Sequence, residues 1–146
     1  MVPIIELKGV KEAEDIIKRR IQRLDNLRYP LAQIAKDYFN IERRWFSSEG
    51  EGTWKPLAQS TIKQKKARGF KTKILQRTGM MKREFSGEEK GGLAITNNTL
   101  SVRIRRSPQW ELHQRGNGRP KRVVISPVIK SRNQYWSGIV TNWIKG

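Results

Sequence analysis

The chain is 146 residues long, carries a net charge of +18 at pH 7 and contains no cysteine. The length suits one domain with its own core, and the missing thiols exclude structural disulfides, thiolate metal sites and cysteine nucleophiles. No apolar run approaches the roughly 20 residues that cross a bilayer, and the N-terminal residues lack the pattern of a secretory signal peptide.

The positive charge is unevenly distributed. Residues 1–50 carry ten basic and eight acidic side chains, a net charge of +2, whereas residues 51–146 carry 21 basic and five acidic side chains, a net charge of +16. Such a field attracts nucleic acid, an acidic protein face or anionic lipid. We expect a single domain, 1–146, in which a charge-balanced helical region is followed after residue 50 by a basic α+β region with mobile loops.

The first third of the chain predicts two amphipathic helices. Residues 2–7 are short and apolar and suggest an edge strand. Apolar residues then recur at helical spacing over residues 10–28, where Glu14 and Lys18 form a favourable pair four residues apart. A second helix is predicted over residues 31–47, either as a hairpin partner of the first helix or as its continuation through a kink.

The most informative stretch runs from residue 46 to residue 79. A turn containing Gly50 and Gly52 leads into Trp54-Lys55-Pro56-Leu57, and a helix is predicted from residue 59 or 60 to about residue 68, before Gly69. Thr78 is predicted to cap a short helix over residues 79–85. There is no acid between Glu51 and Glu84, but there are ten basic residues: Lys55, Lys63, Lys65, Lys66, Arg68, Lys71, Lys73, Arg77, Lys82 and Arg83.

The second half mixes short strands and helices. Residues 93–95 and 100–106 predict two strands joined by a tight turn at Asn97-Asn98. Ser107-Pro108 predicts the start of a helix that ends before Gly116, residues 123–125 predict a strand, and a C-terminal helix is expected from about residue 132. This order predicts an α+β fold in which N-terminal amphipathic helices pack on a small antiparallel sheet, with short helices and a C-terminal helix.

No catalytic constellation is recognisable. His113 is the only histidine, its neighbours form no triad or metal site, and the acids lack nuclease-like spacing. We therefore predict no catalytic residue, metal ligand or cofactor. Basic clusters at 63–77, 103–106 and 115–122 are the functional candidates, as contacts for DNA phosphates or for an acidic ring of a partner protein. The candidate contact residues are Lys63, Lys65, Lys66, Arg68, Lys71, Lys73, Arg77, Arg115, Arg119, Lys121 and Arg122.

Several short motifs occur in a characteristic order. They are Arg44-Trp45-Phe46-Ser47-Ser48-Glu49-Gly50, Trp54-x-Pro56-Leu57, Ser60-Thr61-Ile62, Ile74-Leu75, Thr78-Gly79, His113-Gln114-x-Gly116 and Arg119-Pro120-x-Arg122. Together they resemble the phage virion morphogenesis, or tail-completion, family of Mu-like contractile-tailed phages. The chain departs from the family pattern at Trp110-Glu111, where an aromatic residue followed by alanine is usual, and at Lys121 and Arg122, where apolar strand residues are commoner.

The resemblance implies a non-enzymatic virion protein that completes the tail or the head–tail junction by forming a homo-oligomeric ring, for which a hexamer is one form. Its expected partners are the neck or connector and the tail proteins, with non-specific contact to DNA and none to membrane. It would be assembled in the host cytoplasm and reside in the virion. The structural landmarks would be Trp54, Pro56, Leu57, Thr78, Gly79, His113, Gln114 and Gly116.

Two other functions stay open. The first alternative is a non-specific DNA-binding accessory protein of a phage or mobile element, which predicts tight, salt-dependent binding to duplex DNA by the monomer. A small nuclease or toxin is the third class, against which the lack of an acidic cluster argues.

Overall fold

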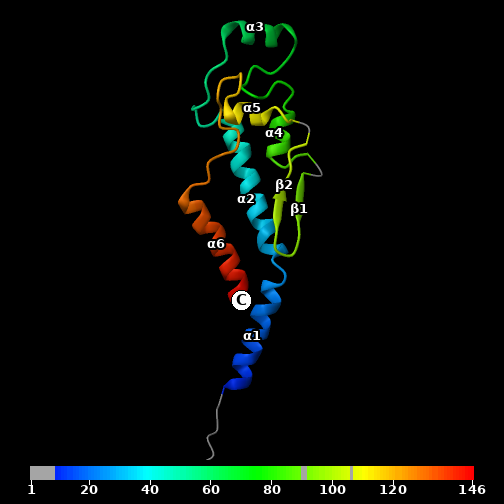
Figure 1. Ribbon diagram of the computed structural model, residues 1–146, viewed down its shortest axis with the longest axis vertical. Coiled ribbons are helices and arrows are strands. Elements are labelled where there is room, and N and C mark those ends of the chain that lie inside the picture. The colour runs from blue at the N-terminus through cyan, green and yellow to red at the C-terminus, as the bar shows by residue number, and fades with distance from the viewer. Residues whose placement is uncertain (1–8, 90–91, 106) are drawn as a thin grey trace, which may run out of the picture.

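The structure is a computed structural model that describes residues 9–89, 92–105 and 107–146, and it confirms the α+β prediction (Figure 1). The strand expected over residues 2–7 and the basic residue Arg106 lie outside the described residues. The elements are α1 (Val10–Leu24), α2 (Arg28–Ser47), α3 (Gln59–Ala67), α4 (Met80–Phe85), β1 (Leu93–Ile95), β2 (Leu100–Val102), α5 (Trp110–Arg115) and α6 (Lys130–Lys145).

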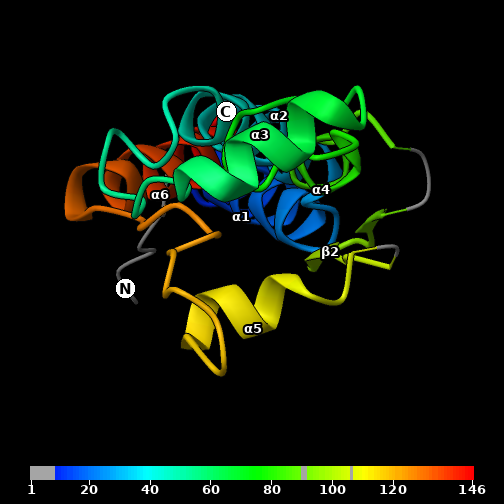
Figure 2. The ribbon, with the colours of Figure 1, turned by 90° about the horizontal axis from the view of Figure 1, so that it is seen from above.

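Helix α2 is the spine of the molecule. It contacts α4, α6 and both strands, and Figure 1 shows α6 running along it while the β1–β2 hairpin lies on its other side. Seen from above, α3 lies over the end of α2, and α5 stands off to one side (Figure 2). The C-terminal end of α2 is therefore surrounded by segments from much later in the chain.

Helix α1 continues the line of α2 away from this body. It ends at Leu24, earlier than the predicted residue 28, and a short break precedes α2. Figure 1 shows α1 extending beyond the body, which excludes the hairpin arrangement and fits the kinked continuation. The break is held in place because the N–H of Leu27 donates to the carbonyl of Asn97 at 2.6 Å. Within α1, Glu14 and Lys18 form the expected pair at 3.5 Å.

The hairpin agrees with the prediction for its turn. β1 and β2 are antiparallel, with Ile95 opposite Leu100, and the N–H of Thr96 donates to the carbonyl of Thr99 at 2.9 Å. The Asn97-Asn98 turn is thus confirmed. β2 ends at Val102, so the predicted strand over 100–106 is too long.

The starts of two short helices were predicted wrongly. Gly79, at a φ of 77°, is the residue that caps α4, and Thr78 lies one position before it, with its Oγ1 accepting the N–H of Met80 at 3.4 Å. α5 begins at Trp110 and not at Pro108, since the carbonyl of Ser107 closes a turn with the N–H of Trp110 at 3.1 Å. In both cases the serine or threonine lies in the turn that leads into the helix.

The predicted strand over residues 123–125 is also wrong. The N–H groups of Val124 and Ile125 donate to Oε1 of Gln114, at 2.7 and 3.3 Å, and not to a neighbouring strand. Val124 is fully buried in the core, and a side-chain amide oxygen takes the acceptor role that a strand carbonyl would otherwise have.

The core lies at the C-terminal end of α2. Phe46 is its centre, since its side chain is 0% exposed and its ring is 5.4 Å from that of Trp54 and 5.6 Å from that of Phe85. The other buried apolar members come from α2, the 74–81 segment and the extended segment. The buried core residues are Trp45, Phe46, Trp54, Ile74, Met81, Phe85 and Val124.

Candidate functional site

The extended segment 122–126 links the motifs of the first half to those of the second. The carbonyl of Val123 accepts two indole N–H groups, those of Trp45 and Trp54, each at 2.8 Å. Trp54 belongs to the Trp-Lys-Pro-Leu turn, whose Leu57 packs against the core while Pro56 remains exposed. The turn is therefore fixed by a carbonyl that is far away in sequence.

The His-Gln-x-Gly motif holds the same segment from its other side. Gln114 binds the N–H groups of Val124 and Ile125, and the carbonyl of His113 accepts the N–H of Arg122 at 2.9 Å. Gly116 ends α5 at a φ of 81°, a conformation in which glycine is favoured. These motif residues, predicted as structural landmarks, form one connected set of contacts.

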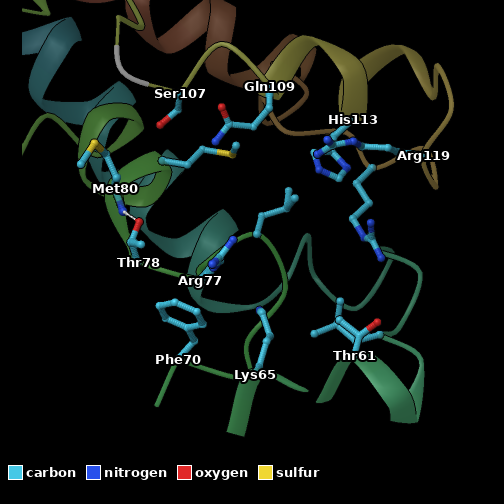
Figure 3. Close-up of a pocket in the computed structure, with 14 residues that line it drawn as sticks. Thr61, Lys65, Phe70, Arg77, Thr78, Met80, Ser107, Gln109, His113 and Arg119 are labelled. Carbon is cyan, nitrogen blue, oxygen red and sulfur yellow. Dashed lines mark hydrogen bonds between the residues drawn. The ribbon is translucent and has the colours of Figure 1, made fainter. Parts of the chain in front are cut away.

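A groove of about 700 Å³ lies beside this set. One side is formed by α3, the loop after it and the start of α4, and the other by Ser107, α5 and the loop that follows it, as Figure 3 shows. We call it the basic groove. Its cationic residues are Lys65, Arg77, Arg119 and Arg122, and its apolar residues are Leu57, Phe70, Leu75, Met80 and Met81. Thr61, Thr78, Ser107, Gln109 and His113 complete the lining.

The basic groove collects some of the predicted contact residues and leaves others outside. Lys65 and Arg77 come from the 63–77 cluster, and Arg119 and Arg122 from the 115–122 cluster, so the two clusters meet across it. Seven predicted contact residues are exposed and do not line it: Lys63, Lys66, Arg68, Lys71, Lys73, Arg115 and Lys121.

Arg122 differs from the exposed contact residue that the sequence predicts. Its side chain is 5% exposed, and its Nε and Nη2 donate to the carbonyl of Lys55 at 3.2 and 2.9 Å. It therefore joins the Trp54 turn to the extended segment. Burial lowers the pKa of Arg122, although a guanidinium keeps its proton in proteins.

Lys65 is close enough to Arg77 and Arg122 for their charges to affect its pKa. The pKa of Lys65 is lowered first by burial and then by the positive charges of Arg122 and Arg77, while the carboxylate of Glu49 raises it in part. Arg77 stacks over the ring of Phe70, with its guanidinium carbon 4.2 Å from the ring centre. The four cations of the groove have no ion-pair partner among residues 9–89, 92–105 and 107–146. A cluster of cations without an acidic partner makes the groove a place where an anion would be stabilised.

His113 is buried at 9% exposure beside these cations. Burial lowers its pKa most, and the charges of Arg122 and Arg119 lower it further, against a hydrogen bond with the Pro120 backbone that raises it. Because proline has no N–H, the imidazole must be the donor to the Pro120 carbonyl. The imidazole is thus neutral near pH 7, and Nδ1 has no hydrogen-bond partner in the described part of the chain.

Sequence reasoning missed the buried polar residues that support this site. Glu42 is 0% exposed on α2, and its Oε1 accepts the N–H of Ser126 at 3.0 Å and its hydroxyl at 2.6 Å. Gln76 donates from Nε2 to the carbonyl of Phe46 at 2.7 Å. Glu42 lies four residues from both Tyr38 and Phe46, so its place on the apolar stripe of α2 was the available signal.

Neither a metal cluster nor a membrane helix is found in the part of the chain that the structure describes. No three or more His, Asp and Glu residues gather there in a way that could hold a metal ion, and none of its helices is long and apolar enough to span a bilayer. Comparisons with family models, curated proteins and solved structures gave no match.

Proposed function

We propose that this protein is a non-enzymatic structural subunit of a phage virion, which completes the tail or the head–tail junction by assembling into a ring. The observation that carries the proposal is the apolar stripe of α1, which lies outside the body of the molecule. The ordered motifs between residues 44 and 122 support the same class of protein by their resemblance to the tail-completion family.

Helix α1 has the apolar stripe of a helix that packs in a core, but its apolar side chains are exposed. Val10, Ile16, Ile17, Ile21 and Leu24 are between 43% and 57% exposed, and no α1 side chain is buried. Only its C-terminal end is fixed, where Arg23 Nη1 donates to the carbonyl of Trp143 at 3.0 Å and the Trp143 indole donates back to the Arg23 carbonyl at 3.2 Å. A contiguous exposed stripe of this kind is typical of a surface that packs in an assembly.

The charge of residues 10–17, the first half of α1, favours a second copy of this chain as the partner. Residues 10–17 carry three acidic side chains and one basic side chain, whereas residues 51–146 of a neighbour carry the large positive excess. The acidic half of α1 is therefore attracted to the body of a neighbouring subunit. A contact between two different surfaces repeats from subunit to subunit and closes into a ring when the rotation allows it.

The first test is the effect of Ile17→Glu on self-association. Ile17 is the most exposed large apolar residue of α1, at 57%, so the fold should tolerate the change while the assembly does not. We expect the association constant between subunits to fall about thirtyfold, or about 2 kcal/mol, because a buried isoleucine contact is replaced by a buried charge. Light scattering over a range of protein concentrations measures it.

Gln22→Glu is the matched control. It adds the same charge to the same helix on the face opposite the stripe and should leave the association constant unchanged within about twofold. Equal masses for the wild type, I17E and Q22E at all concentrations would contradict assembly through α1. Negative-stain micrographs of the assembled wild type should show closed rings, and open filaments would contradict closure.

DNA binding is the second candidate function, favoured by the exposed cations of the 63–77 and 115–122 clusters. It predicts a monomer that coats duplex DNA tightly at physiological salt, with an affinity that falls steeply as salt rises. The same light-scattering series with added DNA separates the two functions: weak binding at physiological salt supports the ring subunit, and saturation of the duplex by monomers supports the alternative.

A further inference from the structure

We infer that the basic groove binds an acidic peptide segment of another protein, with an apolar side chain held on the groove floor and carboxylates held by Arg77, Arg119 and Lys65. This inference goes beyond the proposed function, because it assigns a binding site and the chemistry of its ligand. The elements that line the groove, α3, α4 and α5, lie at the end of the molecule opposite α1 of the same chain (Figure 1).

The shape and lining of the groove suit a peptide. Its volume of about 700 Å³ is within the usual size of pockets that bury organic ligands, roughly 300–1,000 Å³. Phe70, Met80 and Met81 give it an apolar surface that includes two flexible methionine side chains, which adapt well to apolar partners. A bare inorganic anion would leave this apolar surface without a partner.

The charge of the groove requires an anionic ligand. No acidic residue lines it, and the pKa of Lys65 is lowered first by burial and then by the positive charges of Arg122 and Arg77, which repel that of Lys65. Glu49 offsets part of this repulsion from outside the lining, but its Oε1 already accepts the N–H of Ile74 at 2.7 Å. Carboxylates entering the groove would relieve the repulsion that remains.

Two buried polar atoms distinguish a peptide from a nucleic-acid backbone. Ser107 is 1% exposed and His113 is 9% exposed, and neither Ser107 Oγ nor His113 Nδ1 has a hydrogen-bond partner among the described residues. Both residues line the wall that faces Arg77 and Phe70 in Figure 3. Nδ1 of the neutral ring can accept a hydrogen bond when Nε2 carries the proton.

A peptide supplies both partners that the groove requires. Its backbone N–H groups can donate to His113 Nδ1, and its carboxylates can accept from the cations and from the hydroxyl of Ser107. The phosphodiester backbone of DNA presents acceptors only, so it would leave His113 Nδ1 unsatisfied while covering the apolar floor with charge. The combination of cations, apolar floor and buried acceptor therefore favours a peptide.

The experiment measures the binding of a fluorescently labelled octapeptide, in which aspartate alternates with leucine, by anisotropy at physiological salt. The double variant Arg77→Glu with Arg119→Glu should weaken binding at least about tenfold. The control variant Lys63→Glu with Lys66→Glu makes the same change in net charge on exposed residues of α3 outside the lining. It should weaken binding less than about threefold because salt screens distant charges.

Ser107→Ala gives a finer test of the site. Its hydroxyl has no partner in the described protein, so its removal costs the fold no known hydrogen bond, whereas loss of a ligand contact should weaken peptide binding about threefold to tenfold. A peptide with asparagine in place of aspartate should bind at least about tenfold more weakly to the wild type.

Four outcomes would overturn the proposal. They are no binding of the acidic peptide to the wild type, equal losses in both double variants, unchanged binding in S107A, and displacement of the peptide by inorganic phosphate alone at millimolar concentration. Stronger loss of duplex DNA binding than of peptide binding in R77E/R119E would assign the groove to nucleic acid instead. Peptide binding by the I17E variant should equal that of the wild type, so failure of the ring proposal does not remove this one.

Discussion

Phe46→Ala should lower the free energy of unfolding by about 3–5 kcal/mol, the range found when a fully buried aromatic residue is truncated. Phe46 is 0% exposed and its ring lies between those of Trp54 and Phe85. The substitution therefore leaves a cavity where α2, the Trp54 turn and α4 meet. Since small domains have only about 5–15 kcal/mol of stability in total, a large part of it should be lost.

Denaturant unfolding followed by tryptophan fluorescence measures this loss. Phe39→Ala is the matched control, because Phe39 is on the same helix but is only half-buried and packs beside Tyr38 at 5.7 Å. Its cost should be clearly smaller. If the two variants lost equal stability, the core would not be centred on Phe46.

Glu42→Ala should destabilise the protein by about 2–4 kcal/mol, because it leaves the N–H and the hydroxyl of Ser126 buried without their acceptor. Glu42→Gln keeps an acceptor oxygen at the same place and should cost much less. A double-mutant cycle with Ser126→Ala isolates the contact between the two side chains. An E42A variant as stable as E42Q would show that Glu42 does not hold Ser126.

The difference in stability between the wild type and E42Q should depend on pH. Burial raises the pKa of the Glu42 carboxyl, against the hydrogen bonds from Ser126, which lower it. The native state therefore binds this proton up to a higher pH than the unfolded state does. Protonation of Glu42 stabilises the native state at low pH. This stabilisation is lost as the pH rises from the unfolded pKa of about 4.3 through the raised native pKa. E42Q has no such titration, so its stability relative to the wild type should increase with pH across this window.

The parts of the fold that the sequence predicts are those with strong local periodicity. α2 and α6 were expected from apolar residues at helical spacing, and the Asn97-Asn98 turn from its own residue types. The 123–125 segment was mistaken for a strand because the acceptor of its N–H groups, the side chain of Gln114, lies on helix α5. The local sequence pattern does not show that a side-chain oxygen, and not the backbone of a neighbouring strand, will accept these N–H groups.

The candidate site likewise has features that the sequence predicts and features that only the three-dimensional structure shows. The basic clusters are visible in the sequence, but their meeting across one groove depends on the path of the chain between residues 78 and 115. Ser107, which the sequence predicts at the start of a helix, is a buried residue of the groove wall. The partnerless atoms of Ser107 and His113, which distinguish one ligand class from another, arise only from three-dimensional packing.

The attachment of residues 122–126 has a consequence for synthesis on the ribosome. The Val123 carbonyl that accepts the N–H groups of Trp45 and Trp54 is made 78 and 69 residues after them. The C-terminal end of α2 therefore lacks part of its core until residues 122–126 have emerged, and the body folds as one unit. A nascent chain that stops before residue 122 would lack the last piece of its core and would become a substrate for chaperones and proteases.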